Sequence, residues 1–262
     1  MNNWAIVIGV NHYPARDEWT LHGAVRDALA MRDWLLLRSG GNIAPEKLTL
    51  LLAPSPGDPD PGVEFVPATN DNIINSINEL LDSSSMRGDR FYFYFSGHGL
   101  SVNIDLSTKQ GILAGDFDVK ASHHSLTVKS LFELFQSTHF SEQFFIIDAC
   151  PNIPLDKIRL GEFPNVPEPV IPSPPQFVMF ATQPGVKAME TGNYGNESGA
   201  FTSALLEGLK GEGAAKAWDD DTGDYVVRWN ELLAVFSPKT GCLRCNMTSQ
   251  CSYECFKPGH RR

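Results

Sequence analysis

The chain has 262 residues, of which 42% are hydrophobic, so it is long enough for one α/β domain or two small ones with a full core. Its formal net charge of −10 argues against nucleic acid or an acidic membrane as partner, because both bind basic surfaces. No apolar run approaches the roughly 18 residues that a membrane span needs, and the first residues lack the basic flank and apolar run of a signal peptide. Cys150 is the one cysteine among the first 241 residues, which is typical of a reducing cytoplasm rather than of a disulfide framework.

The first part of the chain alternates between predicted strands and helices. A buried strand at 4–10, a helix at 23–38, a strand at 47–53, a helix that Thr69 or Asn70 caps, and a central strand from Phe91 follow one another in this order. Residues 54–67 are rich in proline and acidic side chains and are expected to form a surface loop. This order predicts an α/β fold with a mostly parallel sheet, helices on both faces and right-handed crossovers.

The second part continues the same pattern with longer connections. We expect a hairpin-like excursion at 100–118, a helix at 127–136 and a strand at 143–150. The proline-rich segment 151–175 is expected to have no regular structure, and so long a loop after a candidate nucleophile is more often functional than idle. A strand at 176–182, a helix at 201–209 and a closing segment at 226–236 complete the prediction.

Two strand ends carry the candidate chemistry. Five consecutive aromatic residues from Phe91 predict a strand buried on both faces, which is expected to end at Ser96 and Gly97 and to be followed by His98 between two glycines. A second apolar strand ends in Asp148 and Cys150, 52 residues after His98. Neighbouring parallel strands would bring both residues to the edge of the sheet where ligands bind, and a thiol needs a basic partner to become a nucleophile.

With Ser-Gly-His-Gly at 96–99 and Asp-Ala-Cys at 148–150, the chain resembles the caspase-like cysteine peptidases over roughly residues 4–236. This family includes caspases, metacaspases and paracaspases. The resemblance implies a caspase-like fold and a catalytic pair of His98 and Cys150. It also implies an oxyanion hole formed by the main-chain N–H groups of Gly99 and Cys150. Pro151 replaces the residue that usually follows the cysteine, and it has no N–H to donate.

The same resemblance implies a pocket for the residue before the scissile bond (P1). Asp148 stands where caspases have glutamine and cut after aspartate, and where metacaspases have aspartate and cut after arginine or lysine. Leu21 occupies the position of the caspase arginine, and Asp27 matches an acid of the family. Glu190 resembles a further part of the pocket. Two carboxylates without an arginine favour a basic side chain, with arginine preferred over lysine because its fork can bind carboxylates in pairs. The alternative for Asp27 is a solvent-exposed position on its helix.

Two metal sites are open hypotheses, although the chemistry itself requires no cofactor. The acidic run at 219–224 has oxygen ligands suited to calcium, which activates some metacaspases, and the alternative is a solvated turn. We divide the chain into a peptidase domain at 1–240 and a cysteine-rich tail at 241–262. The tail is either disordered or a zinc site formed by Cys242, Cys245, Cys251 and Cys255.

The sequence therefore predicts a cytoplasmic cysteine endopeptidase that cleaves proteins after basic residues. Its expected partners are protein substrates and an attached or separate sensor or regulatory protein. Two alternatives remain: a catalytically inactive caspase-fold interaction module, and a caspase-clan peptidase of another P1 specificity. Two outcomes stay open for the proline-rich segment, which begins beside the candidate nucleophile: activity as an intact single chain, which we favour, and self-cleavage after Arg159 or Lys157.

Overall fold

The computed structural model describes residues 1–82, 87–104, 107–118, 120, 125–153, 160–163, 166–181, 190–191, 198–212, 215–220, 224–227 and 232. Only the main chain is described at residues 103, 104, 107, 108, 150–153, 190, 191, 198 and 224. The predictions for Lys157, Arg159 and the tail at 241–262 lie outside the described residues. Among the described helices, none has the length and the apolar character that crossing a bilayer requires.

Within the described residues the sheet has eight strands, and most of its neighbouring strands run parallel. Its strands are β1 (Trp4–Val10), β2 (Leu48–Ala53), β3 (Val66–Pro67), β4 (Arg87–Ile104), β5 (Ser107–Leu113), β6 (Ser125–Thr127), β7 (His139–Ile153) and β8 (Gln176–Phe180). Parallel pairing joins β3, β2, β1, β4, β7 and β8 in that order, whereas β5 pairs antiparallel with the second half of β4, and β6 pairs antiparallel with β5. The sheet is therefore mixed but mostly parallel, as predicted.

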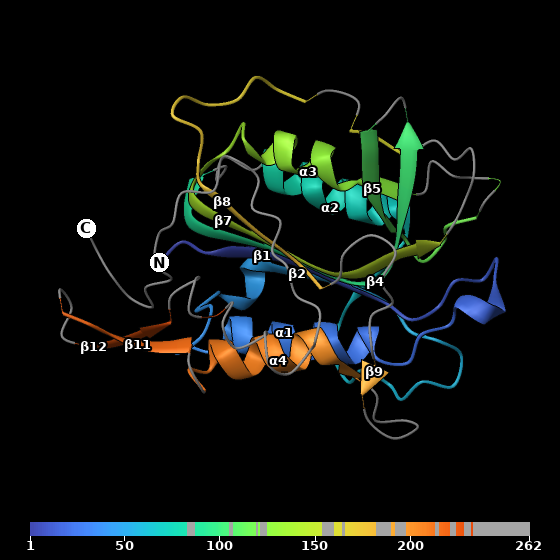
Figure 1. The fold of residues 1–262 in the computed structure, drawn as a ribbon, viewed down its shortest axis with the longest axis horizontal. Coiled ribbons are helices and arrows are strands. Elements are labelled where there is room, and N and C mark those ends of the chain that lie inside the picture. Colours follow the sequence, from blue (N-terminus) through green and yellow to red (C-terminus); the bar gives the residue numbers. More distant parts are fainter. Residues whose placement is uncertain are drawn as a thin grey trace.

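Helices cover both faces of this sheet. They are α1 (Ala24–Leu36), α2 (Asn70–Asp82), α3 (Val128–Phe135) and α4 (Ala200–Leu209), with short 3₁₀ turns at Asp17–Trp19 and Pro45–Lys47. Figure 1 shows α2 and α3 on one face and α1 and α4 on the other. Thr69 caps α2 as predicted, because its hydroxyl accepts the N–H of Asn72 at 3.3 Å.

Each face of the sheet packs into its own core. On β4, Phe91, Phe93 and Phe95 join the cluster with α2 and α3, whereas Tyr92 and Tyr94 join the cluster with α1 and α4. This alternation is what a strand buried on both faces requires. The aromatic run therefore explains why β4 lies at the centre of the sheet.

The central strand does not stop where the sequence suggested. β4 continues through His98 to Ile104, and Leu100 packs on the same face as Phe95, five positions earlier. Strict alternation would place these two residues on opposite faces. The register against β7 shifts between His98 and Leu100, because two residues of β7 lie opposite Gly99 alone, so β7 bulges next to Cys150 where the side chains of β4 change faces.

Other boundaries also moved. β7 extends to Ile153, so the first residues of the proline-rich segment are strand and not loop, with Leu100 and Ile153 in register. The surface loop at 54–67 ends in the short edge strand β3. Two small hairpins follow: β9 (Glu190–Thr191) with β10 (Ser198–Gly199), and β11 (Lys216–Asp219) with β12 (Asp224–Val227). Of the predicted closing segment at 226–236, only residues 226, 227 and 232 are described.

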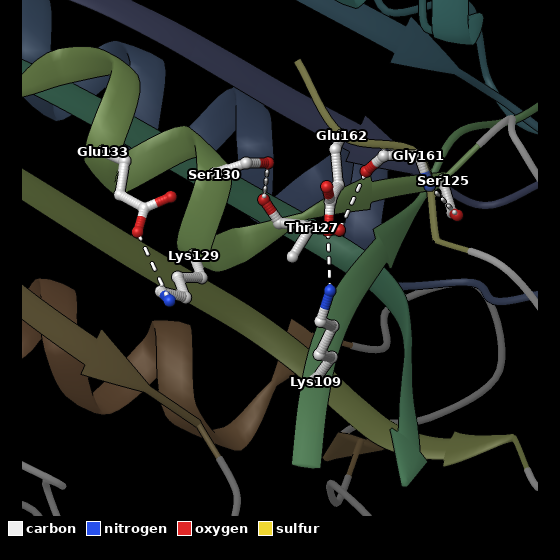
Figure 2. A network of polar contacts seen from close by, with 8 residues as sticks. All are labelled: Lys109, Ser125, Thr127, Lys129, Ser130, Glu133, Gly161 and Glu162. Atoms are coloured by element: carbon white, nitrogen blue, oxygen red, sulfur yellow. Dashed lines mark hydrogen bonds and ion pairs between the residues drawn. The ribbon is translucent and has the colours of Figure 1, made fainter. Parts of the chain in front are cut away.

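The segment at 160–163, which lies beyond the undescribed residues 154–159, is attached to β6. Thr127 donates both its N–H, at 2.9 Å, and its hydroxyl, at 2.8 Å, to the carbonyl of Gly161. Glu162 pairs with Lys109 of β5 at 2.7 Å, and Phe163 is buried in the core with α2 and α3. Figure 2 shows this network. Part of the segment that follows Cys150 is therefore held against the sheet.

Candidate active site

His98 lies where the pairing between β1 and β4 ends. The last paired residues of these strands are Gly9 and Ser96, and on the other side His98 is in register with Cys150 of β7. Neighbouring strands lie about 4.8 Å apart. The predicted catalytic residues are therefore direct neighbours across the sheet. The side chain of Cys150 lies outside the described residues.

Two residues that sequence reasoning missed hold the histidine, and both come from the loop after β1. The phenol oxygen of Tyr13 accepts the main-chain N–H of His98 at 2.7 Å. The imidazole Nε2 lies 2.7 Å from the carbonyl oxygen of Trp19, which can only accept, so Nε2 carries the proton of the neutral ring. Nδ1 is then the basic nitrogen. Only the presence of aromatic residues in an otherwise polar loop hinted at these contacts.

Burial lowers the pKa of His98 below its ordinary value, and the hydrogen bond to the Trp19 carbonyl offsets only part of this effect. The Tyr13 ring lies 4.9 Å from the imidazole and the Trp19 ring 6.2 Å, centroid to centroid. The Tyr13 and Trp19 rings exclude water from the imidazole of His98 and thereby disfavour its charged form. The imidazole is therefore neutral at neutral pH and able to accept a proton.

Position 97 requires a glycine, because neighbouring side chains approach its main chain closely. A Cβ at this position would lie 2.8 Å from the Tyr13 phenol oxygen and 2.9 Å from the Phe95 ring. Any side chain would push away the group that holds the His98 amide. The glycine before the histidine thus serves the contact with Tyr13, which the sequence alone did not reveal.

Asp27 and Asp148 come together as the pocket hypothesis requires. Asp27 lies on α1 and Asp148 near the end of β7, with 3% and 6% of their surfaces exposed. A Cβ on Gly199 would lie 2.8 Å from Oδ2 of Asp27 and 2.7 Å from Oδ2 of Asp148, so both carboxylates meet at this glycine. The alternative of a solvent-exposed Asp27 is wrong, because its helix turns this side chain toward β7 and β10.

Hydrogen bonds hold both carboxylates. The N–H of Gly199 donates to Asp27 Oδ2 at 2.8 Å, and the Thr202 hydroxyl donates to Asp148 Oδ2 at 2.6 Å. Thr202 also lies 2.6 Å from the Tyr94 hydroxyl. Burial, followed by the charges of Asp27 and Asp148, raises the pKa of Tyr94 well above its ordinary value, so this phenol stays neutral. Thr202, on α4, is a third residue that the sequence did not identify.

The remaining predicted site residues are placed only in part. The main chain of Glu190 pairs with Gly199 in the β9–β10 hairpin, which brings it next to the glycine that both aspartates approach. Its side chain is not described. Leu21 is half-buried, and its N–H donates to the carbonyl of Asn11.

The structure describes part of the acidic run at 219–224 and none of the cysteine-rich tail. Asp219 and Asp224 pair across the β11–β12 hairpin, and residues 221–223 between them are not described. Within the described part of the chain, no three His, Cys, Asp or Glu side chains gather as a metal site would need. The four tail cysteines, Cys242, Cys245, Cys251 and Cys255, lie outside that part.

Comparison with known proteins gives one family. The caspase domain model matches residues 2–254. A protein named "Probable protease" from a Desulfuromonadales bacterium is 48% identical over 238 residues, covering 89% of this chain and 29% of that protein. Metacaspase-9 of Arabidopsis thaliana is 29% identical over 99 residues, covering 37% of this chain and 27% of its own length. The chain thus spans less than a third of the curated relatives it matches.

Solved structures with low sequence identity share the fold. Caspase-1 from Spodoptera frugiperda has a TM-score of 0.56 at 17% identity, covering 91% of this chain and 76% of its own. A protein from Geobacter sulfurreducens has a TM-score of 0.55 at 12% identity and 91% coverage of both chains. At such identities the likeness concerns the arrangement of helices and strands.

Proposed function

We propose, from the premise that this chain belongs to the caspase domain family of cysteine peptidases, that it is an endopeptidase using His98 and Cys150 and cleaving after basic residues, arginine before lysine. The observation that carries the catalytic part is the register of His98 with Cys150, together with the bond that leaves Nδ1 of His98 as its basic nitrogen. Nucleophilic catalysis by a thiol needs a basic nitrogen near the cysteine, and the strand that carries Cys150 is the neighbour of the strand that carries His98.

The chemistry follows from these positions. The Cys150 thiol gives its proton to Nδ1 of His98, and the thiolate attacks the carbonyl carbon of the scissile bond. The main-chain N–H groups of Gly99 and Cys150 are our candidates for stabilising the oxyanion. The imidazolium returns the proton to the leaving amine, which leaves a thioester on Cys150. Water, deprotonated by His98, then hydrolyses the thioester and regenerates the thiol.

The choice of a basic P1 residue rests on Asp27 and Asp148. Two buried carboxylates that meet at Gly199 form a strongly acidic site on the α1 and α4 side, and Asp148 precedes Cys150 by two residues on the same strand. A guanidinium entering this site would replace repulsion between carboxylates by paired hydrogen bonds. Glu190 is a third candidate, because its main chain is next to Gly199.

Covalent probes test both parts of the proposal. Peptides with a thiol-reactive group after Arg, Lys, Asn or Asp should label the wild type in the order Arg, Lys, then neither of the others, and should not label Cys150→Ala. His98→Ala should keep the fold and lose turnover. Asp148→Asn should lower kcat/KM for arginyl substrates by an estimated 30-fold or more, as for one lost partner of a buried charge pair. Preferential labelling by the Asp or Asn probe would overturn the assigned specificity, and a folded, active Cys150→Ala protein would overturn the mechanism.

Partners beyond a protein substrate belong to this proposal as well. The curated relatives are more than three times as long as their matched part, so an attached or separate sensor or regulatory region is consistent with their lengths. Calcium activation and a zinc site in the tail remain proposals without support from the described residues.

A further inference from the structure

Tyr13 touches the candidate catalytic histidine in two ways. Its phenol oxygen accepts the main-chain N–H of His98 at 2.7 Å, and its ring lies 4.9 Å from the imidazole at an interplanar angle of 45°. Its own surface is fully buried, at 0% exposure. From a loop 85 positions earlier in the chain, Tyr13 therefore contacts both the main chain and the imidazole of His98.

The end of the pairing between β1 and β4 explains why such a contact is needed. The last pair of these strands is Gly9 with Ser96, so β1 offers no partner to the main chain of His98. A main-chain N–H beyond the last pair of a ladder must find its partner elsewhere. A buried N–H without a partner costs free energy comparable to a lost hydrogen bond, and the Tyr13 phenol supplies that partner for His98.

The loop around Tyr13 holds the other end of the same histidine. The carbonyl of Tyr13 accepts the N–H of Arg16 at 2.9 Å, and this turn leads into Trp19, whose carbonyl binds Nε2 of His98. The Trp19 ring packs on Tyr13 at 6.4 Å and stacks on Phe117 at 6.1 Å. The loop from Tyr13 to Trp19 thus holds both the main-chain N–H and the imidazole of His98 in place.

We propose that Tyr13 is a positioning residue for peptide cleavage, which holds His98 beyond the last β1–β4 pair so that Nδ1 faces the strand of Cys150. This inference rests on the proposed function of His98 as the proton acceptor for Cys150. The charged residues of the surrounding loop are Arg16, Asp17 and Glu18, all of them exposed, and Arg16 pairs with Glu18 at 3.2 Å. The substrate itself does not need to touch Tyr13, so its loss should act on kcat and leave KM unchanged.

The test compares Tyr13→Phe with Tyr92→Phe. Tyr92 is also buried, but it lies on β4 on the face of α1 and α4, away from His98. Tyr13→Phe should lower kcat for an arginyl substrate about tenfold, with KM within about twofold of wild type. Its acid limb of kcat/KM should move up by about half a pH unit, because a loosened site admits water and burial is what lowers the pKa of His98. Tyr92→Phe should change neither parameter.

The outcomes separate the two proposals. An inactive wild type, or activity that survives Cys150→Ala, contradicts the proposed function. An active wild type with the same kcat and acid limb in Tyr13→Phe as in Tyr92→Phe overturns the positioning role alone. If Tyr13→Phe does not fold, Gly97→Ala decides, because its Cβ presses on the same phenol oxygen. A comparable fall in kcat supports the role, whereas wild-type kcat, or failure of both variants to fold while Tyr92→Phe folds, overturns it.

Discussion

The carboxylate of Asp148 accepts a hydrogen bond of 2.6 Å from the hydroxyl of Thr202, a residue on α4 that lies 54 positions later in the chain. The same hydroxyl lies 2.6 Å from that of Tyr94 on β4. An acid that we propose for the specificity pocket is therefore oriented by a neutral pair of hydroxyls from two other elements.

Thr202→Val should weaken cleavage after arginine. The change keeps the shape of the side chain but removes the donor to a buried carboxylate, and hydrogen bonds to charged groups contribute roughly 1.5–3 kcal/mol. We expect kcat/KM for an arginyl substrate to fall by about tenfold or more. Thr202→Ser retains the hydroxyl and serves as the matched control. Equal kcat/KM in the Val and Ser variants would show that Asp148 does not depend on this bond.

The stability of the fold should decrease below about pH 6.5 in a way that depends on His98. Burial lowers the pKa of His98 in the folded state, so as pH falls the unfolded chain takes up a proton first. Folding stability associated with this residue is complete above the unfolded pKa and is lost as pH falls toward the lower folded pKa. Urea unfolding of wild type and His98→Gln between pH 5 and pH 8 measures the difference. If the two slopes match in the acid range, His98 does not contribute to acid destabilisation.

The attachment of residues 160–163 to β6 should add measurable stability. Thr127→Val removes the hydroxyl that donates to the Gly161 carbonyl, and the buried position of Thr127 predicts a loss of about 1 kcal/mol in the free energy of unfolding. Lys129→Ala is the control, since its pair with Glu133 at 3.4 Å is exposed and is expected to contribute about 0.5 kcal/mol or less. Chemical denaturation of both variants checks the prediction. A loss for Lys129→Ala as large as for Thr127→Val would contradict it.

Any self-cleavage should fall on the N-terminal side of residues 160–163, which are attached to β6. Lys157 and Arg159 lie in the interval 154–159, between the strand of Cys150 and the segment that Thr127 holds. Cleavage after either residue should leave the two fragments associated, because residues 160–163 remain bound to β6. Intact-mass analysis of wild type beside Cys150→Ala gives the test, and native gel filtration shows whether the fragments separate. Identical nicking in Cys150→Ala would identify a contaminating protease.

Much of the fold could be predicted because it depends on patterns local in sequence. The sequence predicted β1 and α2 to within a few residues of their observed bounds, Trp4–Val10 and Asn70–Asp82. Strand ends were less predictable, since glycine and proline near His98 and Cys150 suggest turns. Instead, β4 is extended by pairing with β5 and β7, and β7 is extended by pairing with β4. The pairing of β4 with β7 joins residues far apart in the chain.

The candidate residues His98, Cys150, Asp27 and Asp148 could be identified from residue type, spacing and resemblance, because motifs carry their chemistry with them. The contacts that orient these residues could not. Tyr13, the carbonyl of Trp19 and Thr202 act through main-chain groups and hydroxyls, which almost any sequence supplies, and their roles depend on where the β1–β4 pairing ends and where α4 packs. Hydrogen bonds act over about 3 Å, a distance that spacing along the chain does not determine. The sequence by itself thus determined which groups can react, and only the tertiary structure decided how they are held.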